Sequence, residues 1–203
     1  MTKDELARRL LNACAEVKSA EAELTEIDSH FGDADHGLTM RKICTAIESA
    51  VQGECGNAKD MLSAAADAVM CLNGGSAVPL WNSWLDGLAE GAPEADALDV
   101  PALKAVFAAG LEELDDMSGA KVGDKTMMDA LIPAVEAIQA CPSDDIKEIL
   151  EAGAKAALAG AASTVEMKAN FGRARNYGER SVGYADSGAT SWSCMFESFA
   201  QAL

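Results

Sequence analysis

The sequence contains no apolar run that approaches the roughly 20 residues needed to span a membrane. It is also poor in basic residues, with 16 Lys and Arg against 33 Asp and Glu and a formal net charge of -17. The phosphates of a nucleic acid or of an anionic membrane surface would repel such a chain, so we expect neither as a partner. A phosphorylated small ligand is not excluded, because a metal ion or a local cation can offset the charge.

A segment of strand length with alternating polarity is also missing. Apolar residues instead recur every three or four positions, as at Met40, Ile43, Ile47 and Val51, which is the spacing of a buried helix face. The breaks are rich in glycine and proline, and none is long enough to separate two domains. We therefore predict an all-α protein in which residues 1–203 form one domain, a bundle or barrel of about eight helices. Loops at one end of such a barrel lie close together and can form a site.

The six cysteines include no C-x-x-C pair, and most lie within helical apolar patterns. They are expected to be buried, reduced thiols, and a zinc site has little support. The first residues, "MTKDELARRLLNACAEV", mix both signs of charge and have no apolar core of a signal peptide, which favours a cytoplasmic protein.

The stretch "EIDSHFGDADHGLTM" concentrates negative charge between two helical patterns, with Asp28, Asp33 and Asp35 in the spacing D-x4-D-x-D. Carboxylates this close repel one another, and a hard divalent cation such as Mg²⁺ removes the conflict. An EF-hand that begins at Asp33 fails, because its twelfth position is Cys44 rather than Glu. A solvated acidic turn of helix-capping aspartates remains the alternative.

Other loops combine glycine with residues that bind phosphate. His36 opens a predicted helix and can donate a hydrogen bond to a phosphate oxygen, although it can equally cap the helix or pack. The turn "NGGSAV" can present backbone N–H groups, although most such turns are ordinary. Arg173, Arg175 and Arg180 lie among glycines in an acidic chain, where they suit phosphate or form surface salt bridges.

Four segments together resemble one family, the nucleotide-binding L subunits of dihydroxyacetone kinases. These segments are "EIDSHFGDADHGLTM", "NGGSAVPLW", "GAKVGDKTMMDALIPAVEA" and "GRARNYGERSVGYADSGATS". The resemblance covers the chain essentially from end to end, and it implies an eight-helix barrel. It also implies that Asp28, Asp33 and Asp35 hold two Mg²⁺ ions, which bind the phosphates of ADP or ATP.

The resemblance further implies which residues lie around the nucleotide, and it assigns no protein nucleophile to this chain. The nucleotide-contacting positions that it implies are His36, Gly37, Leu38, Thr39, Ser76, Ala77, Gly119, Met127, Arg173, Asp186, Ser187 and Gly188. Phosphoryl transfer asks a protein mainly for positioning and charge neutralisation, which these residue types can supply.

In this family the ketose binds to a separate K subunit, so the resemblance implies one component of a kinase. A bound ADP that a phosphohistidine protein of the phosphotransferase system recharges is the favoured mode of action. Two alternatives stay open. One is an ATP-exchanging subunit for another short ketose such as erythrulose. The other is a non-catalytic, nucleotide-bound module that docks onto a transcription regulator. A homodimer is a further open alternative.

Three departures from the family pattern concern the phosphate contacts. The usual G-G-x-S-G reads "GGSAV" here, so Ala77 replaces a hydroxyl and Val78 replaces a glycine, where a β-branched residue disfavours positive φ. Ser187 stands where D-P-G is usual, which is expected to loosen the last loop. These changes leave the detail of phosphate binding and the identity of the ketose open.

Overall fold

The computed structural model describes residues 1–201, so residues 202–203 of the predicted domain lie outside the described part. Nearly all of the regular structure is helical. The elements are α1 (Lys3–Ser19), α2 (Glu21–Ser29), α3 (His36–Val51), α4 (Ala58–Met70), α5 (Ala77–Gly91), α6 (Val100–Ser118), α7 (Met128–Ala140), α8 (Ile146–Ser163), η1 (Thr164–Glu166), η2 (Ala174–Ser181) and α9 (Ser187–Gln201). Within residues 1–201 no strand forms beyond a single isolated bridge between Thr2 and Ala97.

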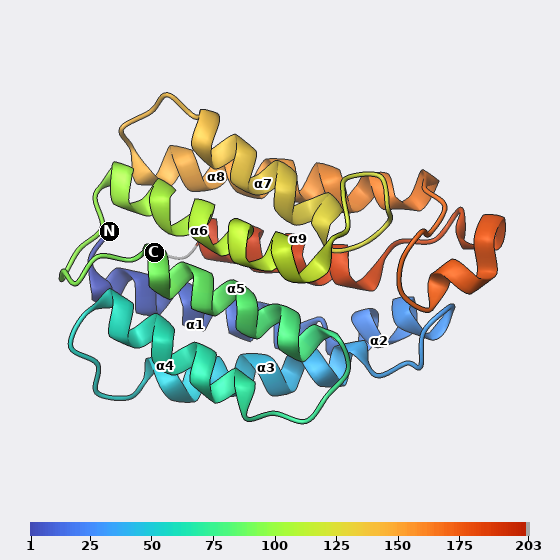
Figure 1. The fold of residues 1–203 in the computed structure, drawn as a ribbon, viewed down its shortest axis with the longest axis horizontal. Helices are drawn as coiled ribbons and strands as arrows, with labels where there is room; N and C mark the ends of the chain where they lie inside the picture. Colours follow the sequence, from blue (N-terminus) through green and yellow to red (C-terminus); the bar gives the residue numbers. More distant parts are fainter. Residues whose placement is uncertain (202–203) are drawn as a thin grey trace.

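Eight of the α-helices form a closed ring (Figure 1). Each helix contacts the next in the order α1, α3, α4, α5, α6, α7, α8 and α9, and α9 returns to contact α1. The short α2 continues from α1 after a break at Ala20 and packs on α3 and α9. The predicted all-α barrel of about eight helices is therefore confirmed.

Polar caps fix where several helices begin. The side chains of Thr2, Asn57 and Asp99 accept hydrogen bonds from backbone N–H groups in the first turns of α1, α4 and α6. Such caps satisfy donors that have no partner within the helix. Gly119 ends α6 in the left-handed region, at φ 65°, which glycine adopts without a steric penalty.

The loops that carry the sequence motifs lie at one end of the barrel. The connections 30–35, 71–76, 119–127 and 164–186 are all at the right in Figure 1, whereas the chain begins and the description ends at the left. This arrangement arises because successive ring helices run in opposite directions, so every second connection returns to the same end. The predicted placement of the site loops at one end is thus seen in the structure.

The barrel interior is lined by apolar side chains, and an aromatic cluster between α5 and α9 borders a cavity of about 50 Å³. The ring of Trp192 stacks on Trp81 at 4.1 Å between centroids and meets Trp84 edge-on at 5.2 Å. Small residues bring neighbouring helices close: a Cβ added at Gly87 of α5 would lie 2.6 Å from the Ala109 carbonyl oxygen of α6. The fold therefore combines a bulky centre with close helix contacts.

The expectation of buried, reduced cysteines holds only in part. All six cysteines are free thiols, and Cys14 and Cys44 are buried. Cys71 is exposed, however, because it follows the last turn of α4 in the connection 71–76. Among the described helices, none is both long enough and apolar enough to cross a membrane.

A buried arginine joins the two ends of the described chain and provides a test of the ring closure. The side chain of Arg9 is 1% exposed, and its Nη1 donates to the carbonyl oxygens of Phe199 (2.8 Å) and Ala200 (3.0 Å) on α9. We expect Arg9→Met to lower the free energy of unfolding by about 3 kcal/mol, because two buried carbonyls lose a charged donor. Urea unfolding followed by circular dichroism measures this loss. The exposed neighbour provides the control, since Arg8→Met should change stability by less than about 0.5 kcal/mol. Equal effects of the two variants would contradict the role of Arg9.

Candidate functional site

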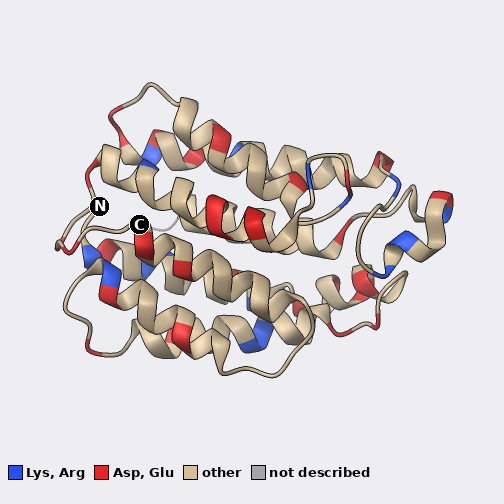
Figure 2. Cartoon of the chain, in the orientation of Figure 1, with Lys and Arg blue, Asp and Glu red and all other residues tan. Residues whose placement is uncertain are grey.

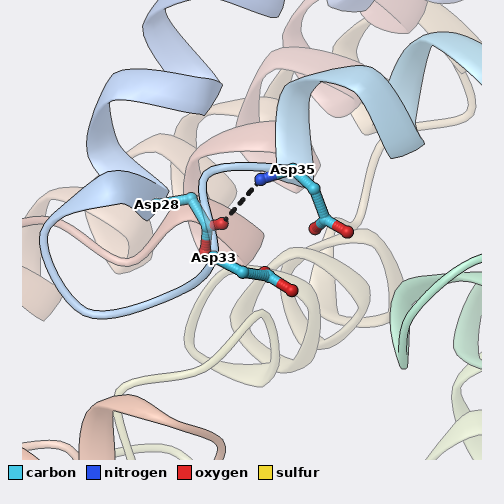
Figure 3. A group of neighbouring side chains, drawn as sticks. All are labelled: Asp28, Asp33 and Asp35. Atoms are coloured by element: carbon cyan, nitrogen blue, oxygen red, sulfur yellow. Dashed lines mark hydrogen bonds between the residues drawn. The ribbon is translucent and has the colours of Figure 1, made fainter.

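Three aspartates converge in the connection between α2 and α3. Asp28 lies in the last turn of α2, and Asp33 and Asp35 follow in the loop (Figure 3). Each offers a carboxylate oxygen, and these oxygens all lie within 4.8 Å of one another. The backbone N–H of Asp35 donates to Oδ2 of Asp28 at 3.2 Å, which holds the loop in this curve. The side chain of Asp35 makes no capping hydrogen bond to α3, so helix capping does not explain its position.

The electrostatics of this loop favour a bound cation. Burial, together with the charges of Asp33 and Asp28, raises the pKa of Asp35. A hydrogen bond from Arg173 lowers the pKa of Asp33. Three convergent carboxylates are the hard oxygen ligands that Mg²⁺ takes in proteins, usually together with water and phosphate oxygens. The donor set therefore fits Mg²⁺, and the ion would remove the repulsion that raises the pKa of Asp35.

Gly32 allows the close approach within this loop. A Cβ added there would lie 2.1 Å from Oδ1 of Asp28, a separation that no real contact shows. We expect Gly32→Ala to displace the Asp28 carboxylate and to weaken Mg²⁺ binding about tenfold, as loss of an orienting neighbour does at metal sites. Calorimetric titration measures the change. Gly53→Ala is the control, because Gly53 is an exposed glycine in the connection between α3 and α4, away from the site, where an added Cβ would lie 3.1 Å from the nearest atom. Unchanged binding by Gly32→Ala would contradict the assigned geometry.

Arg173 connects the aspartate loop to the long connection before α9. Its guanidinium forms an ion pair with the carboxylate of Asp33, and both side chains are about half exposed. Figure 2 shows the basic positions of this connection at the same end of the barrel as the acidic α2–α3 loop. The other two arginines differ: Arg175 is exposed, and Arg180 lies over the ring of Tyr177 at 5.3 Å. Of the three arginines, the structure brings Arg173 to the aspartates.

The first turn of α3 packs into the site rather than pointing freely outward. His36 Nε2 lies 3.1 Å from the hydroxyl oxygen of Ser191 on α9, and burial lowers the pKa of His36. Gly37 is buried, since a Cβ there would lie 2.1 Å from the Glu21 carbonyl oxygen of α2. Leu38 is 37% exposed, and Thr39 is buried. The predicted stretch 36–39 thus borders the aspartates, with His36 turned toward α9.

The connection 71–76 lies beside this turn. A Cβ built on Gly74 would lie 3.5 Å from the methyl group of Thr39, so the two segments are neighbours. Ser76 precedes α5 without a capping hydrogen bond from its side chain, and Ala77 is the first residue of α5. Val78 is buried within the helix, where a β-branched residue meets no need for positive φ.

The remaining predicted residues lie in the connections that precede α7 and α9. Met127 precedes α7 and approaches Gly188 of α9, since a Cβ at Gly188 would lie 3.3 Å from Cβ of Met127. Gly119 stands at the start of the same connection as Met127. Burial raises the pKa of Asp186 to about 6, and its Oδ1 accepts the Ala189 N–H at 2.7 Å. Asp186 therefore caps α9.

Ser187 begins α9 next to the aspartate loop. Its hydroxyl oxygen lies 3.5 Å from Oδ1 of Asp28, so the first residue of α9 reaches the aspartate loop. A looser last loop was expected at this position, and that expectation stays a prediction; the structure gives the serine a polar neighbour in the site.

Two buried polar residues, Lys125 in the connection 119–127 and Asp129 in the first turn of α7, were not assigned a role from the sequence. Asp129 accepts hydrogen bonds from the backbone N–H groups of Gly123 (2.6 Å) and Thr126 (2.7 Å). Lys125 is 3% exposed and has φ 59°. The segment "GDKTMMD" contains both residues, but no pattern of residue types in it shows that either side chain is buried.

The fold and the site together define a helical-barrel protein that gathers carboxylates, an arginine and helix N-termini at one end, a combination suited to a metal-bound phosphate. Residues 30–201 match the DAK2 domain, and the chain belongs to this family. The resemblance seen in the sequence is thereby confirmed.

Two relatives and one solved structure illustrate the similarity. The ADP-binding subunit DhaL of the PEP-dependent dihydroxyacetone kinase of Escherichia coli (strain K12) is 32% identical over 199 residues, which cover 95% of this chain and 93% of the relative. The D-erythrulose kinase of Mycolicibacterium smegmatis is 35% identical over 196 residues, covering 92% of this chain but 33% of that enzyme. The crystal structure of the C. freundii dihydroxyacetone kinase in complex with AMP-PNP and Mg²⁺ superposes with a TM-score of 0.75 at 25% identity, over 98% of this chain and 34% of that one.

Proposed function

We propose that this chain is the nucleotide- and Mg²⁺-binding subunit of a dihydroxyacetone kinase. The observation that carries the proposal is the trio of carboxylates from Asp28, Asp33 and Asp35, converging within 4.8 Å beside Arg173. Its support from relatives is the match to an ADP-binding subunit over 93% of that subunit's length. Residues 1–203 would then form one nucleotide-binding domain.

The residues would divide into metal ligands and nucleotide contacts. Asp28, Asp33 and Asp35 would hold two Mg²⁺ ions, which would neutralise phosphate charge when bound. The proposed nucleotide contacts are His36, Gly37, Leu38, Thr39, Ser76, Ala77, Gly119, Met127, Arg173, Asp186, Ser187 and Gly188. For Asp186 the contact would come from the backbone, because its carboxyl group caps α9.

The chain's own residues would act by orientation and charge. The free N–H groups at the start of α3 would face phosphate oxygens, and the Arg173 guanidinium would offset negative charge next to the carboxylates. No side chain of this protein needs to become covalently modified, because phosphoryl transfer depends mainly on positioning. The ketose would be held by a K-type subunit that docks at this end of the barrel.

The phosphoryl donor is proposed to be a phosphohistidine protein of the phosphotransferase system, which recharges bound ADP. This mode is supported by the names of the DhaL relatives, which describe PEP-dependent kinases and, in Lactococcus lactis, a PTS-dependent kinase. We place the protein in the cytoplasm, where its phosphoprotein donor would be found. Docking onto a transcription regulator and formation of a homodimer are further proposals.

A second candidate is an ATP-exchanging kinase subunit for erythrulose. The 35% identity to a D-erythrulose kinase favours it, and so does the departure of Ala77 and Val78 from the family's glycine loop. In that case the nucleotide would leave after each turnover, and no phosphoprotein would be required.

The nucleotide content of the purified protein separates these functions. The protein is purified in Mg²⁺ without added nucleotide, denatured, and its supernatant is analysed by anion-exchange chromatography. Near-stoichiometric ADP supports a retained cofactor and a phosphoprotein donor. An empty site that binds ATP reversibly favours the exchanging kinase. A protein that binds no nucleotide under either condition contradicts both kinase candidates, and a non-catalytic docking module without nucleotide would take their place.

A further inference from the structure

The ammonium group of Lys125 is surrounded by backbone carbonyl oxygens. Its Nζ lies 2.8 Å from the carbonyl oxygen of Thr164, 3.0 Å from that of Met167, and 2.6 Å from those of Ser181 and Tyr184. The side chain is 3% exposed, and burial lowers the pKa of Lys125. Backbone carbonyl oxygens therefore take the place of most of the water around the ammonium group.

These four carbonyls belong to the two ends of one segment. We call residues 164–186 the cap segment; Thr164 and Met167 lie at its beginning, and Ser181 and Tyr184 lie near its end. Three backbone N–H groups are fixed in the same region: Ala169 donates to the Ser181 hydroxyl (2.9 Å), Asn170 to the Asp124 carbonyl (3.1 Å) and Gly183 to the Val165 carbonyl (2.7 Å). Lys125 therefore joins both ends of the cap segment to the connection before α7.

The cap segment carries Arg173 at its outer part, where the arginine pairs with Asp33. The position of Arg173 depends on how the two ends of the segment are held. Four carbonyl oxygens that converge on one point repel one another, and the positive charge of an ammonium group offsets this repulsion. Its three N–H groups are shared among the four carbonyl oxygens. Carbonyl cages of this kind also replace the water around small monovalent cations.

We propose that Lys125 is a positioning residue whose ammonium acts as a built-in cation, closing the base of the cap segment so that Arg173 is presented to the aspartate loop. The proposal rests on the proposed function only for its consequence in nucleotide binding. The closure itself is a property of the protein alone.

The test compares Lys125→Ala with Lys121→Ala in protein free of Mg²⁺ and nucleotide. Lys121 is the matched control, because it lies in the same connection but is exposed and pairs with Asp115. Hydrogen exchange at the N–H groups of Ala169, Asn170 and Gly183 should accelerate about tenfold or more in Lys125→Ala and stay unchanged in the control. Propylammonium, which replaces the missing stem and head group, should restore slow exchange. Tetramethylammonium at equal ionic strength should not, because it has no N–H to donate.

Two outcomes would overturn the proposal: unchanged exchange at these three positions, or an equal acceleration throughout the barrel helices, which would indicate only a general loss of stability. If Lys125→Ala does not fold, Lys125→Met keeps the apolar stem and should show the same local acceleration; normal exchange there would also overturn the proposal. Nucleotide affinity in Mg²⁺ is measured separately and should fall about ten- to a hundredfold in Lys125→Ala. If the exchange results hold but the wild type binds no nucleotide, the proposed function fails and the positioning role stands.

Discussion

Replacing Asp28 with asparagine is expected to abolish phosphoryl transfer in the reconstituted kinase. Asp28 is central to the carboxylate trio, because its Oδ2 also accepts the backbone N–H of Asp35. Asparagine keeps an oxygen for that hydrogen bond, so the loop should retain its shape while losing one negative charge. Weaker Mg²⁺ binding removes several kcal/mol of charge stabilisation, and each 1.36 kcal/mol corresponds to a tenfold change in rate. We therefore expect turnover to fall by about a thousandfold or more.

The stability of the same variant distinguishes a lost metal site from a damaged fold. In EDTA, Asp28→Asn should be at least as stable as the wild type, because one of the charges that raise the pKa of Asp35 is gone. A carboxyl whose pKa is raised by folding favours the folded state at low pH, and this contribution is lost as the pH rises through the shifted pKa. The metal-free wild type should therefore lose stability as the pH rises above about 4, and Asp28→Asn should lose less.

Thermal unfolding with and without Mg²⁺ makes the comparison, with turnover measured on the same preparations. Asp144→Asn is the control, because Asp144 is an exposed acid in the connection between α7 and α8, at the opposite end of the barrel. Mg²⁺ should raise the unfolding temperature of Asp144→Asn by as much as it raises that of the wild type. Undiminished turnover by Asp28→Asn, or an unchanged stabilisation by Mg²⁺, would contradict the metal assignment.

The helical fold could be predicted because its signals are local. The spacing of residues such as Met40, Ile43 and Ile47 repeats within single helices, and glycine or proline marks most of the breaks. The closure of the ring by α1 and α9, in contrast, could not be predicted from local patterns. The contact between α1 and α9 includes a buried Arg9, a residue type that usually indicates a surface position.

Some residues of the candidate site could likewise be predicted from the sequence, and others could not. Asp28, Asp33 and Asp35 could be recognised because their spacing is short and their mutual repulsion requires an explanation. The contacts of Lys125 could not be inferred, because its four carbonyl partners lie about 40 to 60 residues away in the sequence. Asp129 bonds to N–H groups only three and six residues away, but the sequence does not show that its side chain is buried. The left-handed conformation of Lys125 is rare for a residue with a side chain and leaves no mark in the sequence. A buried polar residue is thus visible only once its partners are known.

Trp192→Ala is expected to have the largest effect on stability. Trp192 is 1% exposed on α9, and it stacks on Trp81 and meets Trp84 of α5 across the barrel. Truncation of a buried tryptophan removes its packing and leaves a cavity, at a cost of about 3–5 kcal/mol. That is a large part of the about 5–15 kcal/mol by which a typical domain is stable. Urea unfolding followed by circular dichroism at 25 °C measures the difference.

Two comparisons show whether the loss of stability in Trp192→Ala comes from removing side-chain packing at the centre of the barrel. Leu158→Ala removes an apolar side chain from α8 that is 51% exposed, and it should cost less than about 0.5 kcal/mol. Added indole should raise the unfolding midpoint of Trp192→Ala but not that of the wild type, because a dry apolar cavity can bind a ligand that fills it. A cost below about 1 kcal/mol would contradict a tightly packed centre, since it would mean that α5 and α9 close the gap without strain. If the loss of unfolding free energy reaches about 3–5 kcal/mol but indole does not reverse it, the helices have collapsed into the space in a strained form. In that case the ring closure, rather than the cavity, determines the stability of the barrel.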